Sequence, residues 1–407
     1  MTTASAYRAV LTGIGCVSPF GVGGYTLVAE MLTVHRSAIQ PWTGGATTHL
    51  RSHLAAEVPA ACLPTTEEAR RWSRLSHMTV LACRHAVLEA GLDSAAAPET
   101  LGLVVGSQYG DLRSTEAFCQ GFLRKGPVGL SPLLFPSTVM NAMAGATSIA
   151  LGFKGPMLTV NQSGGAGELA VARAITLLRA GRAQAVLACG VDELFPLLYE
   201  TLVQLQVTSP RDAGEEACRP FDQRHNGPIL GEGATAVVLE TLAHARARGA
   251  PILAEVHGAC WGGIPTRPGH IPQRTPSHPS ALDRALCDAA LRPEDVGLVY
   301  TSGNGDPQQD DLELACLRET FDSPGPLLTS ITHLTGDYGG LGTLRVAAAA
   351  VTLRQGVCAR LDYLHESLPP APRFTTEPLN EPPATVLVHG LALGGAHTAI
   401  LLGGPTT

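Results

Sequence analysis

Residues 155–167 read GPMLTVNQSGGAG, and this stretch gives the clearest indication of the fold. Residues 157–160 are typical of a short strand, and the glycines after them indicate a tight turn. Residues 168–180 then predict a helix, with Gly181 where a C-capping glycine is expected. Such a turn exposes one residue at a helix N-terminus, where free amides stabilise an anion or an activated nucleophile. Taken alone, however, these residues favour an ordinary strand–helix connection.

The rest of the chain alternates apolar strands with longer helical stretches, which predicts an α/β fold. A boundary near residues 249–251 divides it into residues 1–249 and 250–407. The strands expected in the first half are residues 9–13, 101–106, 157–160, 185–189 and 235–240, with helices at 74–90 and 168–180. The second half repeats this pattern, with strands at 252–257, 296–300, 327–329, 385–389 and 398–401, and helices at 280–290, 309–321 and 341–355. Residues 261–279 and 366–383, rich in proline, are expected to be ordered loops or partner contacts.

Composition excludes several functional classes. The 407 residues, 45% hydrophobic, suffice for two domains or one duplicated domain. A net charge of -7 without a basic block argues against nucleic-acid binding. The start lacks the pattern of a signal peptide, and the longest apolar stretches, such as residues 346–353, are too short to span a bilayer. The ten cysteines include no CxxC spacing, which favours buried reduced thiols over a zinc site. We therefore expect a cytoplasmic protein without membrane contact, metal or cofactor.

Five stretches, in the same order along the chain, resemble the β-ketoacyl synthases, the condensing enzymes of fatty-acid and polyketide assembly. They are VLTGIGCVSPFG (10–21), LGLVVGSQYGD (101–111), SPLLFPSTVMNAMAG (131–145), CRPFDQRHNGPILGEGA (218–234) and LALGGAHTAILL (391–402). The resemblance implies a thiolase-like fold, in which two similar α/β halves form a layered α-β-α-β-α arrangement. It also implies an obligate dimer.

The departures from that family concern its chemistry. Gly164 stands at the position of the nucleophilic cysteine and Ser302 at that of the first active-site histidine. Thr332 replaces the family's lysine and Asp337 its second histidine. Condensation needs a thiolate to hold the acyl chain and imidazoles to stabilise the enolate and oxyanion. Gly164 has nothing to acylate and Asp337 would repel an enolate, so no catalytic residue is predicted.

Two neighbouring residues could replace the lost groups. Ser163 is next to the expected nucleophile and His333 lies four residues before Asp337, but nothing in the sequence pairs them. Many chain-length factors of aromatic polyketide synthases resemble ketosynthases with glutamine at the cysteine position. Here Gln162 lies two residues too early, which argues against simple membership in that subgroup.

The leading hypothesis is a noncatalytic chain-length factor. In the systems that it resembles, an inactive homologue and a ketosynthase with an intact cysteine form a heterodimer. The pair works with an acyl carrier protein and encloses a tunnel for the growing acyl chain. One alternative is decarboxylation of a malonyl-carrier protein without condensation, and another is a homodimeric pseudoenzyme that binds acyl chains. The product class and the chain length are left open.

Four large apolar residues are candidates for the tunnel floor: Phe118, Phe122, Phe135 and Met140. In the resembling proteins this region reaches the dimer interface, where bulky side chains limit the length of the product. The spacing of Phe118 and Phe122 puts them on one face if the segment is helical. The strand at 157–160 is expected to pair across the two-fold axis of the dimer.

Overall fold

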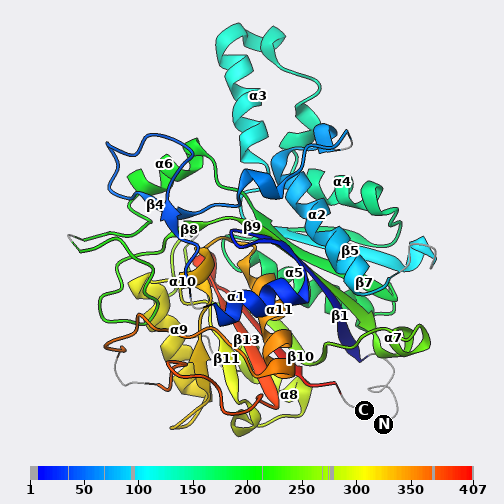
Figure 1. The fold of residues 1–407 in the computed structure, drawn as a ribbon, viewed down its shortest axis with the longest axis vertical. Coiled ribbons are helices and arrows are strands. Elements are labelled where there is room, and N and C mark those ends of the chain that lie inside the picture. Colours follow the sequence, from blue (N-terminus) through cyan, green and yellow to red (C-terminus); the bar gives the residue numbers. More distant parts are fainter. Residues whose placement is uncertain are drawn as a thin grey trace.

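A computed structural model of the chain describes residues 8–34, 36–67, 69–92, 97–212, 214–267, 269–273, 275, 279–368 and 372–405 (Figure 1). The strands are β1 (Ala9–Ser18), β2 (Gly21–Gly23), β3 (Gln40–Pro41), β4 (Leu54–Ala56), β5 (Leu101–Ser107), β6 (Met157–Asn161), β7 (Ala185–Asp192), β8 (Leu230–Gly231), β9 (Gly233–Thr241), β10 (Ala254–Gly263), β11 (Leu298–Tyr300), β12 (Leu327–Thr329), β13 (Thr385–Leu391) and β14 (Ala396–Gly403). The α-helices are α1 (Tyr25–Thr33), α2 (Arg74–Glu89), α3 (Leu112–Lys125), α4 (Ala142–Leu151), α5 (Ala166–Arg179), α6 (Pro196–Gln204), α7 (Leu242–Ala247), α8 (Ala281–Ala289), α9 (Pro307–Thr320), α10 (Thr332–Thr335) and α11 (Leu341–Gln355). Within the described residues, no helix combines the length and the hydropathy needed to cross a membrane.

The main sheet is built twice from the same pattern of strands. The first half runs β1-β9-β7-β5-β6 and the second β10-β14-β13-β11-β12. In each half the first two pairings are antiparallel and the last two parallel. β1 and β10 join the halves by antiparallel pairing. This repeat of the strand pattern agrees with two halves that meet near residues 249/250. A domain boundary at that point stays a prediction.

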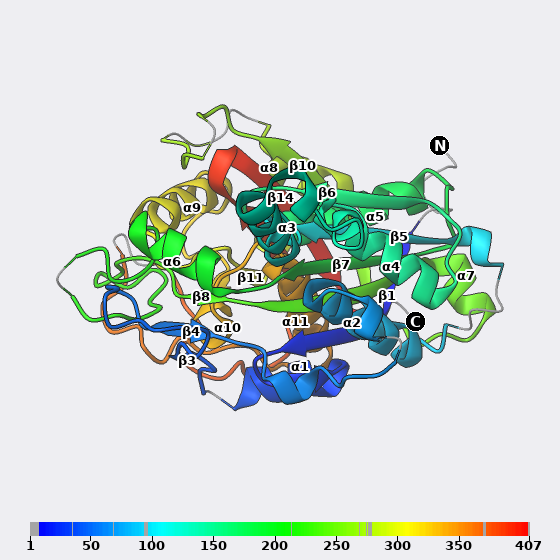
Figure 2. The same ribbon diagram turned by 90° about the horizontal axis from the view of Figure 1, so that it is seen from above.

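The helices form three layers around the two half-sheets. α5 and α11 pack on each other and contact strands of both halves, so they make the central layer (Figure 2). α2 and α4 cover the outer face of the first half, and α8 and α9 that of the second. The α-β-α-β-α arrangement of a thiolase-like fold is therefore confirmed.

Most expected elements are present, with ends shifted by a few residues. Gly181, at φ +64°, follows α5 in the left-handed conformation that a C-capping glycine adopts. Residues 261–263 extend β10 and are not part of a loop as expected, because they pair with β14. The expectation of buried thiols is wrong for Cys119 and Cys287, which are exposed on α3 and α8.

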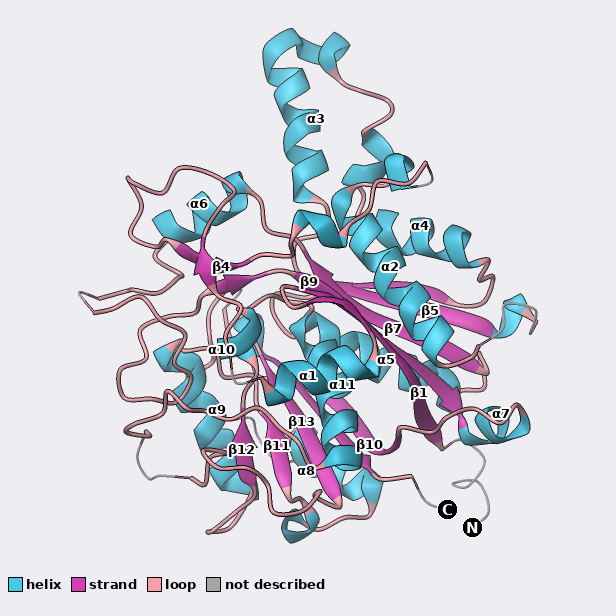
Figure 3. Ribbon diagram, viewed as in Figure 1, coloured by secondary structure: helices cyan, strands magenta, loops and turns pink. Residues whose placement is uncertain are grey.

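The segment from α3 to the short 3-10 helix η6 (Phe135–Thr138) projects from the body of the molecule (Figures 1 and 3). We call residues 112–139 the arm. α3 begins with a capping hydrogen bond, in which the Asp111 side chain accepts from the backbone N–H of Ser114. None of the residues of α3 is buried. β6, the last strand of the first half, contacts α4, which also contacts η6 at the end of the arm, and β6 pairs only with β5 in the described sheet. The arm and β6 together form a surface that this chain leaves largely uncovered.

We expect Gly15→Ala to destabilise the fold. A Cβ at this position in β1 would lie 1.9 Å from the carbonyl oxygen of Ala82 in α2, so strand and helix would have to separate. Such overpacking costs about 2 kcal/mol or more. Gly45→Ala is the control, because a Cβ there would meet no atom closer than 3.8 Å. Urea unfolding should give a lower midpoint for the first variant and an unchanged one for the second; equal midpoints would contradict the close packing of β1 on α2.

Candidate functional site

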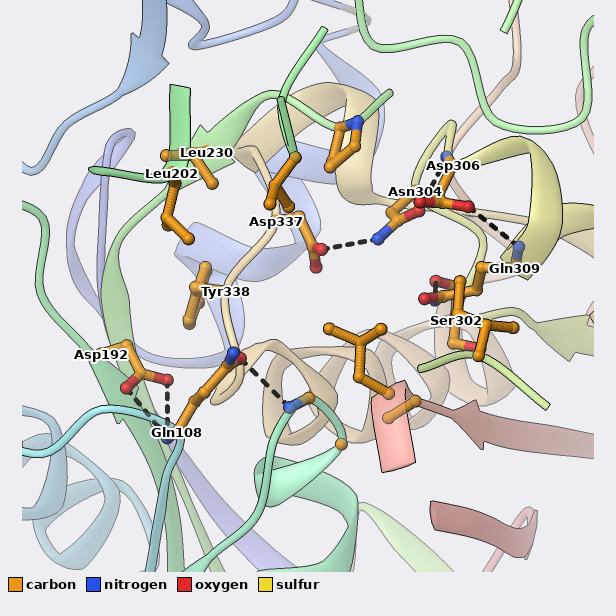
Figure 4. Close-up of a pocket in the computed structure, with 18 of the residues that line it drawn as sticks. Gln108, Asp192, Leu202, Leu230, Ser302, Asn304, Asp306, Gln309, Asp337 and Tyr338 are labelled. Atoms are coloured by element: carbon orange, nitrogen blue, oxygen red, sulfur yellow. Dashed lines mark hydrogen bonds between the residues drawn. The ribbon is translucent and has the colours of Figure 1, made fainter. Parts of the chain in front are cut away.

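Three of the four degenerate positions line one pocket of about 320 Å³, shown in Figure 4. Gly164 belongs to the turn before α5, Ser302 to the loop after β11, and Asp337 to the loop between α10 and α11. The fourth position, Thr332, is buried and does not line the pocket. The fold thus brings together from distant segments most of the positions that the sequence had singled out.

The turn at the nucleophile position has no reactive group and little free space. Gly164 and Gly165 have φ angles of +70° and +60°, which favour glycine. A Cβ at Gly164 would lie 2.8 Å from the Cβ of Ala392. The backbone N–H of Gly164 donates a hydrogen bond of 3.1 Å to Oε1 of Gln108. Residue 164 therefore has no side chain, and its amide is paired within the chain.

Ser302 is held in place through its backbone and its side chain. Its N–H donates to Oε1 of Glu313 at 2.8 Å, and its carbonyl accepts from Nε2 of Gln309 at 2.9 Å. Its Oγ accepts a hydrogen bond of 3.0 Å from the backbone N–H of Leu391. The hydroxyl thus serves as an acceptor for the backbone, and it cannot replace the general base function of an imidazole.

Thr332 and Asp337 also make internal hydrogen bonds. Oγ1 of Thr332 donates to the carbonyl oxygen of Gly303 at 2.9 Å, inside the protein. Oδ2 of Asp337 accepts from Nδ2 of Asn304 at 2.7 Å. Burial raises the pKa of Asp337, and the hydrogen bond from Asn304 opposes that shift. Neither residue supplies the positive charge or the donor that an enolate requires.

Two imidazoles, those of His389 and His397, lie behind the site, whereas that of His270 belongs to a residue that lines the pocket. Nδ1 of His389 is 2.6 Å from Oε1 of Glu313, and Nε2 of His389 is 2.9 Å from Nε2 of His397. All three side chains are buried, and none lines the pocket. Burial, followed by the proximity of His389, lowers the pKa of His397 to about 3, so this ring is neutral at physiological pH. The hydrogen bonds that connect His397, His389 and Glu313 hold the backbone of Ser302 in place. These three side chains are not positioned to contact a ligand in the pocket.

A buried ion pair lies beneath the glycine turn. Glu168, in the first turn of α5, pairs with Arg345 of α11, whose Nη1 also donates to the carbonyl oxygen of Thr301 at 2.8 Å. Glu168 occupies the space left by the missing side chain of Gly342, where a Cβ would lie 1.8 Å from Oε2. Burial raises the pKa of Glu168, which Arg345 opposes. This pair links the two central helices next to the pocket.

The candidate replacement groups are not part of the pocket. Neither Ser163 nor His333 lines it, and the His333 ring packs against Tyr363 with centroids 5.0 Å apart. Gln162 does not line it either. Neither candidate replacement therefore lies at the pocket wall, where the serine and the histidine among the described residues are Ser302 and His270.

The four candidate tunnel residues lie on the arm or at its base, away from this pocket. None of them lines it. The rings of Phe118 and Phe135 contact each other with centroids 5.9 Å apart, Phe122 and Phe135 are exposed, and Met140 packs on Gly110. The segment that carries Phe118 and Phe122 is helical, so their spacing of four residues places them on one face of α3. Their role as a tunnel floor stays a prediction.

The sequence did not single out three of the residues that shape the pocket: Gln108, Ala392 and Asn304. The signal for Gln108 was present, because it lies in the family-like stretch GSQYGD. The contacts of all three are made with residues far away in the sequence and could not be read from it. Among the described residues, no group of three or more histidine, cysteine, aspartate or glutamate side chains is arranged to hold a metal ion.

Comparisons with known proteins agree with this geometry. Residues 7–245 match the family described as Beta-ketoacyl synthase, N-terminal domain, and residues 253–362 match its C-terminal domain. A Streptomyces halstedii protein named as a polyketide beta-ketoacyl synthase 1 is 30% identical over 429 residues, covering 98% of each chain.

Solved structures show the same fold. The ishigamide ketosynthase/chain length factor has a TM-score of 0.88 at 24% identity, covering 98% of this chain and 100% of that one. A second structure is a type II polyketide synthase acyl-carrier protein in complex with its ketosynthase bound to the hexaketide. It has a TM-score of 0.85 at 20% identity, with the same coverage. The chain therefore belongs to the β-ketoacyl synthase family, although Gly164, Ser302 and Asp337 supply neither a thiol nor an imidazole to its pocket.

Proposed function

We propose that this chain is a noncatalytic subunit that pairs with an active ketosynthase and limits the length of the acyl chain which the pair builds. The observation that carries the proposal is the pocket around Gly164, Ser302 and Asp337. Its lining contains no cysteine, and none of these three positions supplies an imidazole. A scaffold retained without its chemistry is what a structural role beside an active partner would produce.

The uncovered arm and strand support a partner chain. Apolar side chains exposed on the arm, α4 and β6 are Phe122, Leu123, Val128, Leu133, Phe135, Val139, Ile149 and Met157. An edge strand offers unpaired N–H and C=O groups to another strand, and water solvates an apolar surface of this extent poorly, so both favour association. A similar fold is found in a ketosynthase/chain length factor, which supports a ketosynthase as the partner.

The acyl carrier protein is proposed as a partner of the complex, since a similar ketosynthase structure contains one. The acyl chain would enter from the partner's active site and reach the arm of this chain at the interface. That location agrees with the exposure of Phe122 and Phe135, which need a second surface to enclose a tunnel. The cytoplasmic location stays a prediction.

The first test is covalent loading. We expect no acyl adduct after incubation with an acyl-carrier protein thioester, because Gly164 has no side chain. Intact-mass spectrometry measures this, with an active ketosynthase as positive control. Since Cys119 and Cys287 are exposed and can exchange with thioesters, the measurement is repeated on the C119S/C287S variant. A stoichiometric adduct on that variant, at Ser163 or elsewhere, would rule out the noncatalytic role.

The second test is assembly. We expect the chain to be soluble only with its ketosynthase and to form a heterodimer through β6. Met157→Lys places an unpaired charge on that strand and should weaken association at least about 10-fold, or about 1.4 kcal/mol. Val34→Lys is the control, because Val34 is an exposed apolar residue that follows α1, on a segment other than the arm, α4 and β6. Analytical ultracentrifugation distinguishes the outcomes: a stable monomer contradicts the proposal, and a homodimer without affinity for a ketosynthase favours the acyl-binding pseudoenzyme.

The third test is the length of the product. Phe118→Ala and Phe122→Ala should each shift products towards longer chains, because the cavity left behind accepts a further two-carbon unit. Each methylene buried there is worth about 0.8 kcal/mol, so the balance between extension and release shifts appreciably. The reconstituted synthase is assayed by mass spectrometry of its products, with Leu88→Ala as control. Reduced total product of unchanged length would place the floor of the tunnel elsewhere.

A further inference from the structure

Inside the arm, α3 and the segment that returns to the body meet backbone to backbone (Figures 1 and 3). A Cβ at Gly121 of α3 would lie 2.4 Å from the carbonyl oxygen of Gly129, and one at Gly129 would lie 2.1 Å from the carbonyl oxygen of Gly121. Gly129 is the last residue of the short 3-10 helix η5 (Gly126–Gly129), which follows α3 directly. Neither Gly121 nor Gly129 has a positive φ, so both positions need glycine for space and not for backbone conformation. We call this approach the glycine contact.

One face of α3 is built around the glycine contact. Phe118, Gly121, Phe122 and Lys125 follow one another at the spacing that places residues on the same side of a helix. The ring of Phe118 meets that of Phe135 in the returning segment, with centroids 5.9 Å apart and planes inclined by 49°. This face therefore packs on η5 and η6, which are the main neighbours of α3 among the described elements.

The opposite face of α3 borders a groove of about 530 Å³ between the arm and α6. The residues that α3 contributes to this groove are Leu112, Thr115, Glu116, Cys119, Gln120 and Leu123. The body of the molecule therefore does not pack closely against this side of the helix. The place of α3 depends on the returning segment that it meets through the glycine contact.

The helix itself needs this support. α3 has 14 residues and none of them is buried, and a helix of that length is only marginally stable in water without tertiary contacts. Glycine inside a helix is less favourable than alanine, so Gly121 weakens α3 further while it allows the close approach. Because the arm contributes no buried residue of α3 to the body, loss of the glycine contact should change the arm and leave the body intact.

We infer that Gly121 and Gly129 are positioning residues for the length of the product. By holding α3 against the returning segment, they set the spacing between Phe118, Phe122 and Phe135, the apolar side chains proposed to limit the acyl chain. This last step rests on the proposed function, which places the floor of the tunnel on the arm. A surface that is already in its binding shape also loses less conformational entropy on association, so the glycine contact favours the partner as well.

The test compares two variants with a matched control. Gly121→Ala and Gly129→Ala each introduce a Cβ into the glycine contact. Gly145→Ala makes the same change in α4, where a Cβ would meet no atom within 4 Å, and α4 contacts both η6 and β6 at the side of the arm. Gly15→Ala, which separates β1 from α2, serves as the reference for a body that is destabilised.

The first measurement is amide hydrogen exchange over residues 113–125, on the full chain in the assembly in which it is purified. We expect Gly121→Ala and Gly129→Ala to accelerate exchange in α3 at least about 10-fold, because the clash separates the helix from its support. Gly145→Ala should leave it unchanged, and all three variants should keep the urea midpoint of the parent chain. The inference is overturned if exchange in α3 does not change, or if the midpoint falls as it does for Gly15→Ala, since the glycines would then serve the body.

The second measurement is the length distribution of the products of the reconstituted synthase. In Gly121→Ala and Gly129→Ala the ratio of longer to parent-length products should rise at least about 4-fold, the factor to which one buried methylene corresponds. Gly145→Ala should give the parent distribution. Faster exchange in α3 with products of unchanged length overturns the inference.

The variants Phe118→Ala and Phe122→Ala show where a failure lies. If they lengthen the products and the two glycine variants do not, the positioning role of the glycines is wrong while the proposed function stands. If none of the four changes the length, the floor of the tunnel is not on the arm, and both proposals fail. The exchange measurement needs neither a product nor a known partner, so it tests the glycine contact separately.

Discussion

The N-termini of the two central helices meet backbone to backbone, and the pocket depends on this close approach. A Cβ at Gly167 of α5 would lie 2.4 Å from the carbonyl oxygen of Gly340, just before α11, and one at Gly190 of β7 would lie 2.1 Å from the same oxygen. Only glycine permits such contacts. The carboxylate of Asp192 accepts the N–H of Gly340 at 3.0 Å and so ties β7 to α11. The loops that carry Gly164 and Asp337 start from this junction, which is why they share one pocket.

The proposed loss of catalysis agrees with the side chains around that junction. Gly164, Ser302 and Asp337 supply neither a thiol nor an imidazole, and the side chain of Gln108 accepts the hydrogen bond of the Gly164 amide. A buried amide without a partner costs free energy, so this pairing stabilises a pocket that, on the proposed role, binds no reacting oxygen. The Glu168–Arg345 pair follows the same logic, since each charge is tolerated in the interior because the other is present. The polar groups of the pocket are thus largely paired within this chain, whereas the arm and β6 keep an exposed apolar surface.

Much of the fold was predictable because local patterns agreed with it. The expected strand at residues 327–329 and helix at 341–355 match β12 and α11 residue for residue. The extension of β10 over residues 261–263 was missed, since proline, glycine and histidine nearby suggested a loop, whereas pairing with β14 decided for a strand. The exposure of Cys119 and Cys287 was also missed, because local sequence does not tell which helix faces become covered.

The sequence by itself determined the layered α/β fold and the residue types at Gly164, Ser302, Thr332 and Asp337, the positions compared with the family's reactive groups. Both follow from residue identity and local order, which are fully present in the chain. Only the tertiary structure decided that Gln108 caps the amide of Gly164, that Ala392 fills the space above it, and that the arm stands uncovered. These are contacts between segments far apart in the sequence, or their absence. They depend on how the two halves of the chain pack together. A local pattern of residues does not determine which distant segments come into contact.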